Sequence, residues 1–181
     1  MTTPIVTFEI CRSCRKCCIF NEQELDEAPV ITTDAKNCLM EQFPNEEIAF
    51  EPLGRMWRIV LHPTPVEHRW VCPFYDSQTA RCRIQHLKPL GCVFYPFYVM
   101  RYQGRLVIAT SRICPASTAL DTTALVAYLR VGPGPLMVRE ARKHPDIVID
   151  HREGIRILLE VHGDDLLPYD ESGERSSGCE S

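Results

Sequence analysis

The chain has 181 residues, of which 45% are hydrophobic, and its formal net charge is −4 at pH 7. This length fits one domain with a short appendage, and the composition allows a real hydrophobic core. The acidic balance argues against nonspecific nucleic-acid binding. The N-terminus lacks the basic segment and apolar core of a signal peptide, and the longest apolar run, 91–100, is far shorter than the ~20 residues of a membrane helix. We therefore expect a cytoplasmic protein with no membrane association.

The first elements are short and lie between cysteines. Helix-starting residues at 32–34 predict a short helix over 35–43 that ends before a proline. Alternation of apolar and polar residues predicts strands over 56–61, 69–74 and 81–85. The next stretch, 88–96, contains two prolines and a glycine, and we expect it to be irregular.

The second half of the chain gives stronger local signals. Residues 98–111 predict a hairpin that turns at Gln103-Gly104. Asp121 is expected to cap a helix that runs to about Arg130.

A Gly-Pro-Gly-Pro segment separates that helix from a further predicted helix, 136–143, which ends before Pro145. Residues 147–161 predict a final hairpin with its turn at 152–154. The polar, Ser- and Gly-rich residues 164–181 predict a disordered tail.

These elements indicate the α+β class, as a small, irregular, cysteine-rich domain of short strands, hairpins and a few short helices that is stabilised by metal. We expect a single metal-binding domain over 1–163. Its cysteine-cluster core is 11–115, and its helix and hairpin part is 116–163.

Eight of the ten cysteines form a pattern that indicates metal ligation. Four lie in the octapeptide CRSCRKCC and four follow at wide spacing: Cys11, Cys14, Cys17, Cys18, Cys72, Cys82, Cys92 and Cys114. Thiolates three residues apart can converge on one ion, because a tight turn between them directs both sulfurs inward. Since cytoplasmic thiols stay reduced, disulfide pairing is the weaker interpretation.

Cys17 and Cys18 pose a separate question, because adjacent side chains of an extended chain point in opposite directions. We therefore expect that the two do not bind one mononuclear ion together. One of them would then serve a second centre or be a bystander. Eight ligands would fill two four-coordinate sites, or one site with spare thiols.

The ligand count does not distinguish zinc from an iron–sulfur cluster, since both accept four thiolates. The Cys-Pro pairs at 72–73 and 114–115, the irregular spacing of the ligands and the aromatic residues around them favour an iron–sulfur cluster, of the [4Fe–4S] type. Plain core packing would account for the aromatic residues equally well. Zinc is the alternative metal.

Basic residues flank the cysteines: Arg12, Arg15, Lys16, Arg81, Arg83, Lys88 and Arg112. Positive charge lowers the pKa of a thiol and offsets the negative charge of a four-thiolate site. A basic surface of this kind could also dock an acidic redox partner. A solvated rim with no such role is the alternative interpretation.

The chain resembles a known family in the CxxCxxCC motif of 11–18, in Cys72-Pro73-Phe74, in Cys82 and in the segment KPLGC that ends at Cys92. The resemblance is to the YkgJ-type cysteine-cluster family, described as a zinc- or iron-chelating domain, and it covers roughly 11–115. It implies ligand roles for Cys11, Cys14, Cys17, Cys18, Cys72, Cys82, Cys92 and, less directly, Cys114. Many members have glycine where this chain has Arg15.

Other candidate ligands lie outside this motif. Cys38 is expected to be a small buried residue of the first helix, and Cys179 a free thiol of the tail. His62, His68 and His86 lie among the ligands in the sequence and could bind metal, but such histidines are more often ordinary surface residues.

No catalytic motif accompanies the cysteines. The chain has no nucleotide-binding glycine motif, no radical-SAM triplet, and neither HExxH nor GxSxG. The sequence leaves enzymatic activity open and favours a metal-binding accessory protein. We expect an iron–sulfur protein that acts in electron transfer or cluster handling for a partner protein. The alternative is a structural zinc module that presents an interaction surface.

Overall fold

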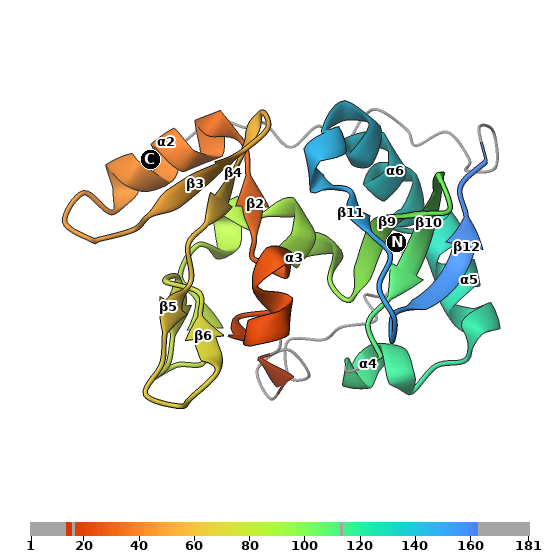
Figure 1. The fold of residues 1–181 in the computed structure, drawn as a ribbon, viewed down its shortest axis with the longest axis horizontal. Coiled ribbons are helices and arrows are strands. Elements are labelled where there is room, and N and C mark those ends of the chain that lie inside the picture. The colour runs from red at the N-terminus through yellow and green to blue at the C-terminus, as the bar shows by residue number, and fades with distance from the viewer. Residues whose placement is uncertain (1–13, 16, 113, 163–181) are drawn as a thin grey trace. The chain divides into compact units, whose positions relative to one another are not determined.

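The computed structural model describes residues 14–15, 17–112 and 114–162, which belong to two compact units (Figure 1). Unit 2 holds the described residues from Arg15 to Val93, and unit 1 holds Cys14 and the described residues from Phe94 onward. Short helices and several small sheets make up both units, so the predicted α+β class is confirmed. That residues 1–163 form a single domain stays a prediction.

Unit 2 contains two three-stranded antiparallel sheets and a two-stranded ribbon. The first sheet has the order β1 (Ile19–Asn21), β6 (Arg69–Val71), β5 (His62–Pro63). The second has the order β2 (Val30–Ile31), β4 (Met56–Ile59), β3 (Phe50–Leu53). The ribbon pairs β7 (Tyr75–Asp76) with β8 (Arg81–Cys82). The predicted strands therefore exist but are shorter than expected, and Pro73 follows closely on the end of β6.

The helical elements of unit 2 are η1 (Glu22–Glu27), α2 (Thr33–Gln42), η2 (Gln85–Leu87) and α3 (Leu90–Phe94), the last of which ends at the boundary with unit 1. The predicted first helix is confirmed, because the Ala35 amide donates to Thr32 Oγ1 at 3.2 Å and caps α2. The expectation that 88–96 is irregular is wrong for 90–94, which form α3. Pro89 precedes α3 and needs no amide donor there, and the amides of Cys92 and Val93 both donate to its carbonyl at 2.9 Å.

The core of unit 2 packs α2 and the strands together. Leu39, Ile59 and Phe74 are fully buried, and the rings of Phe43 and Phe74 lie 5.5 Å apart. Cys72 belongs to the same apolar cluster, so one cysteine is part of the core itself.

Unit 1 is built on a four-stranded sheet in the order β11 (Ile149–Asp150), β9 (Phe97–Tyr102), β10 (Arg105–Thr110), β12 (Arg156–Glu160). The predicted hairpin is confirmed as β9–β10. Gln103 and Gly104 have φ values of 50° and 78°, the left-handed conformation that a tight two-residue turn requires.

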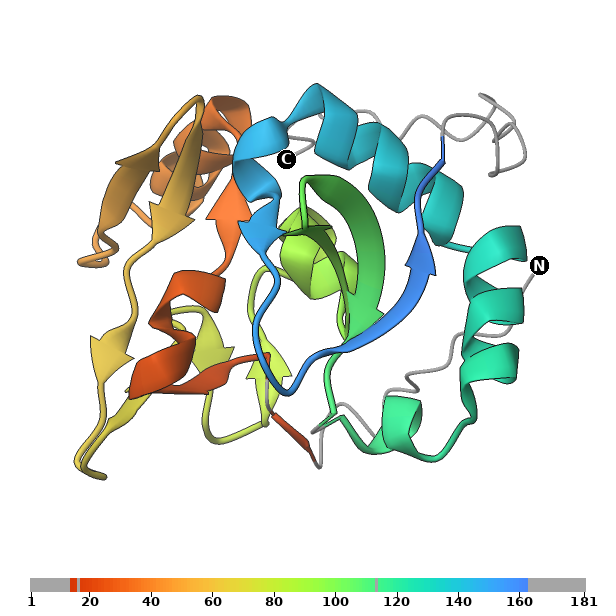
Figure 2. The ribbon, with the colours of Figure 1, turned by 45° about the vertical axis from the view of Figure 1, so that its right-hand side comes forward.

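From Phe94 onward, the described helices of unit 1 are α4 (Pro115–Thr118), α5 (Thr122–Val131), α6 (Gly134–Lys143) and the short η3 (Pro145–Ile147). The two predicted helices are confirmed as α5 and α6, and the Ala124 amide donates to Asp121 Oδ1 at 2.8 Å to cap α5. The two helices pack against each other, α6 also against β9 and α5 against β12 (Figure 2). No helix in the described part of the chain has the length and apolar composition to cross a bilayer.

The predicted final hairpin is wrong. β11 pairs in parallel with β9, with Ile149 opposite Met100, whereas β12 pairs antiparallel with β10, with Leu159 opposite Ile108. The two strands lie at opposite edges of the sheet and do not contact each other through a ladder. A turn signal between two apolar runs predicts two strands but not the strands with which they pair. Here the β9–β10 hairpin has two edges, and each of the last two strands pairs with a different one.

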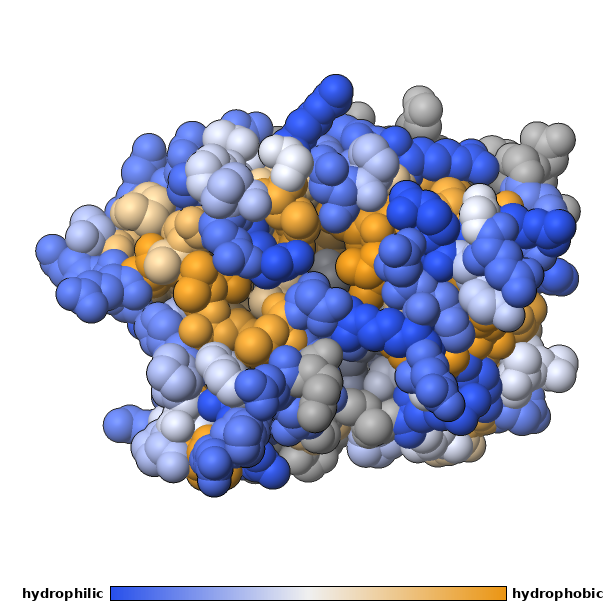
Figure 3. Space-filling view, in the orientation of Figure 1, coloured by the Kyte–Doolittle hydropathy of each residue, from blue (hydrophilic) through white to orange (hydrophobic). Residues whose placement is uncertain are grey.

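Hydrophilic side chains cover most of the visible surface of each unit, and apolar side chains reach it in smaller patches (Figure 3). Large apolar residues with more than two fifths of their surface exposed include Met40, Val66 and Val131.

Candidate metal centre

Four cysteines of unit 2 come from four separate segments and interact with one another electrostatically. Cys17 lies in the turn before β1, Cys72 follows β6, Cys82 lies in β8 and Cys92 lies in α3. The thiol of Cys72 interacts with those of Cys82 and Cys17, and the thiol of Cys92 interacts with all three others. We call these four residues the four-thiol cluster.

Backbone hydrogen bonds bring the segments of the cluster together. The Cys72 amide donates to the Cys18 carbonyl at 2.9 Å and so extends the pairing of β6 with β1 by one residue. The Tyr75 amide then donates to the Cys72 carbonyl at 2.9 Å, which closes a tight turn over Pro73 and Phe74. Tyr75 is in turn the cross-strand partner of Cys82. Short ladders and one turn therefore fix three of the four cysteines relative to one another.

Two cysteines of the cluster, Cys72 and Cys92, hold their protons tightly. Burial raises the pKa of the Cys72 thiol to about 12, and negative charge at Cys82 and Cys17 adds to the effect. Burial first, and then the neighbouring thiols, raise the pKa of Cys92 well above its ordinary value. Neighbouring thiolates repel one another unless a cation lies among them. The donor set therefore fits a thiophilic cation, which would replace these protons.

Two groups, one on the backbone and one on a side chain, already favour the thiolate form of Cys72. A backbone hydrogen bond from Phe74 to the sulfur lowers the pKa of Cys72, and so does the charge of Arg83, although burial outweighs both. Lys88 acts in the same direction on the pKa of Cys92. Donors and positive charges of this kind are typical partners of metal-bound sulfur. Two of the basic residues singled out in the sequence, Arg83 and Lys88, therefore act on the cluster.

Arg83 is held in place by several contacts. Its two NH₂ groups donate to the two carboxylate oxygens of Glu46 at 2.6 Å each, and one of them also donates to the Pro73 carbonyl at 2.9 Å. The hydrogen bonds with Glu46 lower the pKa of that carboxyl group and raise the pKa of Arg83. The guanidinium lies over the ring of Phe43, 5.1 Å from its centroid. No sequence signal indicated Glu46, because 37 residues separate it from Arg83.

The side chains of Cys17 and Cys18 do not point in opposite directions, as was expected for adjacent residues. Their sulfurs lie 3.8 Å apart, on the same side of the chain. The reason is that the segment is a turn and not extended: the amides of Cys18 and Ile19 donate to the Arg15 carbonyl at 2.9 and 3.0 Å. Arg15 has φ of 58°, a left-handed conformation that glycine adopts at no steric cost. The expectation that the two side chains point apart is therefore wrong.

The structure does not add the other predicted ligands to this cluster. Cys14 and Cys114 belong to unit 1, and Cys114 is almost fully buried at the start of α4, where the amides of Ser117 and Thr118 donate to its carbonyl. Cys11 and Cys179 lie outside the described residues, as do Arg12 and Lys16. Their assignments stay predictions.

Cys38 is buried in α2, as expected. It is disulfide-bonded, whereas disulfide pairing was expected to be the weaker interpretation of the cysteines.

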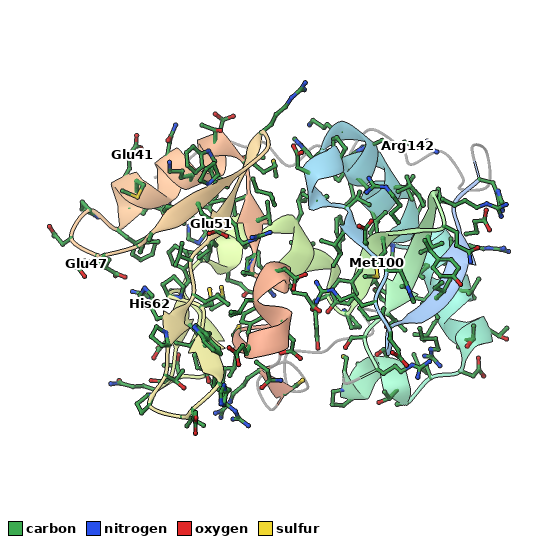
Figure 4. All side chains as sticks on the ribbon, in the orientation of Figure 1. Glu41, Glu47, Glu51, His62, Met100 and Arg142 are labelled. Atoms are coloured by element: carbon green, nitrogen blue, oxygen red, sulfur yellow. The ribbon has the colours of Figure 1, made fainter. Side chains whose placement is uncertain are left out.

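The three candidate histidines are exposed. His68 contacts the carboxylates of Glu22 and Glu67 at 2.8 and 3.2 Å, and His86 contacts the Gln42 carbonyl oxygen at 3.1 Å. His62 is exposed on β5 (Figure 4). These contacts are those of ordinary surface histidines.

The four thiols are not placed as a ready metal site. Within the described ranges, no group of three or more His, Cys, Asp or Glu side chains could hold a metal ion as the side chains stand. Metal binding by the four-thiol cluster would therefore require these side chains to converge.

Comparison with known proteins identifies one family. The model of the CxxCxxCC family, "Putative zinc- or iron-chelating domain", matches residues 10–115, which is more than half of the chain and includes every member of the four-thiol cluster. No curated protein and no solved structure matches the chain. The matched segment runs from the cysteine octapeptide through unit 2 to the β9–β10 hairpin and Cys114. With this match and four thiols gathered in one unit, the chain belongs to the CxxCxxCC family of zinc- or iron-chelating domains.

Proposed function

We propose that Cys17, Cys72, Cys82 and Cys92 hold one metal centre, an iron–sulfur cluster of the [4Fe–4S] type. The protein would use this centre in electron transfer or in cluster handling for a partner protein. The observation that carries the proposal is the mutual electrostatic interaction of four thiols from four separate segments of unit 2. Four thiolates are the ligand set that such a cluster takes.

Three features of the surroundings support a cluster. Cys72 is followed by proline, its sulfur receives a backbone hydrogen bond from Phe74, and Phe74 is fully buried. Hydrogen bonds to sulfur and an apolar surrounding are the main means by which a protein adjusts the potential of an iron–sulfur centre. When bound, the cluster would supply one-electron chemistry, while the chain binds it, limits water access and offsets its charge.

A structural zinc ion is the second candidate, and one distance favours it. With Zn–S bonds of about 2.3 Å in a tetrahedron, two ligand sulfurs lie roughly 3.8 Å apart. The sulfurs of Cys17 and Cys18 have this separation. Zinc would then stabilise unit 2 as an interaction module without redox chemistry.

We further propose a cytoplasmic protein with a protein partner. A reducing compartment keeps the free thiols available for metal. An acidic partner would be attracted to the basic residues beside the cluster, of which the structure describes Arg15, Arg81 and Arg83 as exposed.

The test is the metal content and visible spectrum of full-length protein purified without oxygen. We expect brown protein that contains iron and sulfide and absorbs near 400 nm, roughly where sulfur-to-iron charge transfer falls. Colourless protein with one zinc per chain would show that the centre is a structural zinc ion and not an iron–sulfur cluster.

Serine substitutions test which residues are ligands. Cys72→Ser, Cys82→Ser and Cys92→Ser should each lose the metal, because a hydroxyl replaces a thiolate donor. Cys38→Ser should retain the metal, since Cys38 lies in α2 outside the cluster and the change removes a disulfide but no proposed ligand. Equal loss of metal at Cys38 would show that the proposed ligand set is wrong.

A further inference from the structure

The solvent-facing side of α6 in unit 1 is basic. Arg139, Arg142 and Lys143 are exposed, and their spacing of three and four residues places them on one side of the helix. The apolar residues of α6 are buried on its other side. We call these three residues the basic face of α6.

Two of the three charges have no acidic partner in the described part of the chain. Glu140, the acidic residue of α6, contacts Arg139 at 3.3 Å and His144 at 3.9 Å. No described carboxylate forms an ion pair with Arg142 or Lys143. These two side chains are therefore available to an acidic ligand.

An acidic ligand of suitable composition follows the last described residue. Residues 164–171 read DDLLPYDE, which gives four negative charges and no positive one, together with the apolar residues Leu166, Leu167 and Tyr169. In contrast, residues 94–162 carry nine Lys and Arg against six Asp and Glu, a net charge of +3 in a chain whose total is −4. The two stretches are complementary in charge and attract each other.

The strand register of unit 1 places the start of this segment close to the end of α6. One residue from each strand forms a single row across the sheet, in the order Ile149, Met100, Val107, Glu160. Adjacent strands lie about 4.8 Å apart, so the row is roughly 15 Å long. Lys143, the last residue of α6, precedes one end of the row by six residues, and Asp164 follows the other end by four.

The chain is long enough to close this gap. The Val161 amide donates to the Leu106 carbonyl at 2.9 Å, so β10 holds the chain up to that point. The ten residues that follow span up to about 33 Å when extended, roughly twice the length of the row. The path from Lys143 back to the row is short, because it includes the helical turn η3 (Pro145–Ile147). The segment 164–171 can therefore reach α6 without displacing any described element.

We propose that the basic face of α6 is a docking site for an acidic peptide and that its occupant is segment 164–171 of the same chain. Carboxylates of the segment pair with Arg142 and Lys143, and the apolar side chains cover the stems of these basic residues. Exposed ion pairs are weak, but a short tether holds the segment at an effective concentration on the order of millimolar. Another acidic chain would then bind α6 only by displacing this segment. The proposal does not depend on the metal centre.

The test is zero-length cross-linking of full-length protein with a water-soluble carbodiimide, which joins an amine to a carboxylate in contact with it. Lys143 is the lysine of 94–162, and Lys36 and Lys88 of unit 2 report random encounters. Mass spectrometry should find Lys143 joined to acidic residues of 164–171 in higher yield than either control lysine. The yield should fall several-fold when salt is raised to about 0.5 M, because salt screens exposed charges.

Two matched variants test the position of the contact. Arg142→Glu should lower the yield of the Lys143 cross-link about fivefold, since it replaces an attractive charge by a repulsive one. Arg130→Glu changes the net charge equally, at an exposed arginine of α5, and should leave the yield unchanged. Both positions face solvent, so neither substitution disturbs the core.

A mixture of ordinary and heavy-isotope-labelled protein distinguishes contacts within one chain from contacts between copies. Cross-linked peptides should carry a single isotope throughout, and mixed pairs would assign the segment to a second copy and overturn the proposal. It would also be wrong if the cross-link to Lys143 were no more frequent than those to Lys36 and Lys88. Equal loss in Arg130→Glu and Arg142→Glu would reduce the contact to general attraction between net charges.

Discussion

The guanidinium of Arg83 and the carboxylate of Glu46 form a bidentate ion pair, with both N–O distances at 2.6 Å. Arg83 directly follows Cys82, and it also donates to the carbonyl of Pro73, which directly follows Cys72. Glu46 lies in the loop between α2 and β3. One side chain therefore links two cysteine-bearing segments to the loop that follows α2 and places its positive charge near the thiols.

Replacing Arg83 with glutamine should weaken metal binding. The substitution removes the positive charge near Cys72 and the link between the two segments. Because about a third of the Arg83 side chain is exposed, solvent screens the effect, and we expect a loss of roughly 0.5 to 1 kcal/mol, or two- to fivefold in Kd. Competition titration with a chelator measures the change, and Arg83→Lys should recover part of it.

The control for this variant is another arginine–carboxylate pair of unit 2. Arg58 on β4 donates to Glu51 on β3 at 2.8 Å (Figure 4), and neither residue follows a cysteine. Arg58→Gln should leave the Kd unchanged. If it weakens binding as much as Arg83→Gln, the effect of Arg83 is one of general stability and not of charge beside the thiols.

Metal binding should release protons at neutral pH. The pKa of Cys72 is raised to about 12 and that of Cys92 well above its ordinary value, so both thiols are protonated in the metal-free protein at pH 7. The metal must displace both protons, so affinity should rise with pH throughout the range below these pKa values. Calorimetric titration with zinc in buffers of different ionisation enthalpy counts the protons. Affinity that does not change between pH 6 and 8 would contradict the raised pKa values.

Metal removal should destabilise unit 2 more than unit 1. Three of the four thiols are placed by two- and three-residue strands, which bury little surface of their own. Metal at about a thousandfold over its Kd adds roughly 4 kcal/mol to the free energy of unfolding, which for a chain of this size raises Tm by roughly 8 to 16 °C. Differential scanning calorimetry with and without a chelator measures the shift.

Hydrogen exchange localises the effect. On metal removal, amides of residues 17–93 should lose protection, while those of β9, β10, α5 and α6 should keep theirs. Equal loss in both units, or metal-free protein as stable as the loaded form, would show that metal and folding of unit 2 are not coupled.

Electron transfer requires a reversible redox couple and a docking surface. If basic residues near the cluster attract an acidic partner, reduction of the iron-loaded protein by that partner should slow as ionic strength rises. Charge reversal at the exposed Arg15 and Arg81 should slow it further at low salt, whereas Arg142, exposed on α6 of unit 1 (Figure 4), serves as a control. Voltammetry of iron-loaded protein that shows no reversible couple would exclude this role and leave metal binding intact.

Local signals in the sequence predicted the local parts of this fold. Thr32 and Asp121 cap helices because a hydroxyl or carboxylate can accept the third amide along, and Gln103-Gly104 turns a hairpin because both residues adopt left-handed backbone. Such local signals could not predict which residues far apart in the sequence contact each other. The edge that each last strand joins and the pairing of Glu46 with Arg83 depend on contacts over tens of residues.

The candidate site shows the same division. The motif named Cys17, Cys72, Cys82 and Cys92 as ligands among eight cysteines, but it could not show that these four interact with one another in unit 2. The prediction that the side chains of Cys17 and Cys18 point in opposite directions was also wrong, because that rule holds only for an extended chain and these residues lie in a turn. The turn depends on the left-handed backbone of Arg15, which the residue type does not indicate, because a residue with a side chain seldom adopts that conformation.

The strand order of unit 1 indicates that the family segment needs the residues after it to stay monomeric in solution. The segment ends at residue 115, so it includes β9 and β10 but neither of the strands that flank them. A fragment cut there would present two bare rows of amide and carbonyl groups, one on each side of the hairpin, ready to pair with other copies. In the whole protein β11 and β12 pair with these two edges, so residues 149–160 would protect the chain from self-association even though they supply no ligand to the four-thiol cluster.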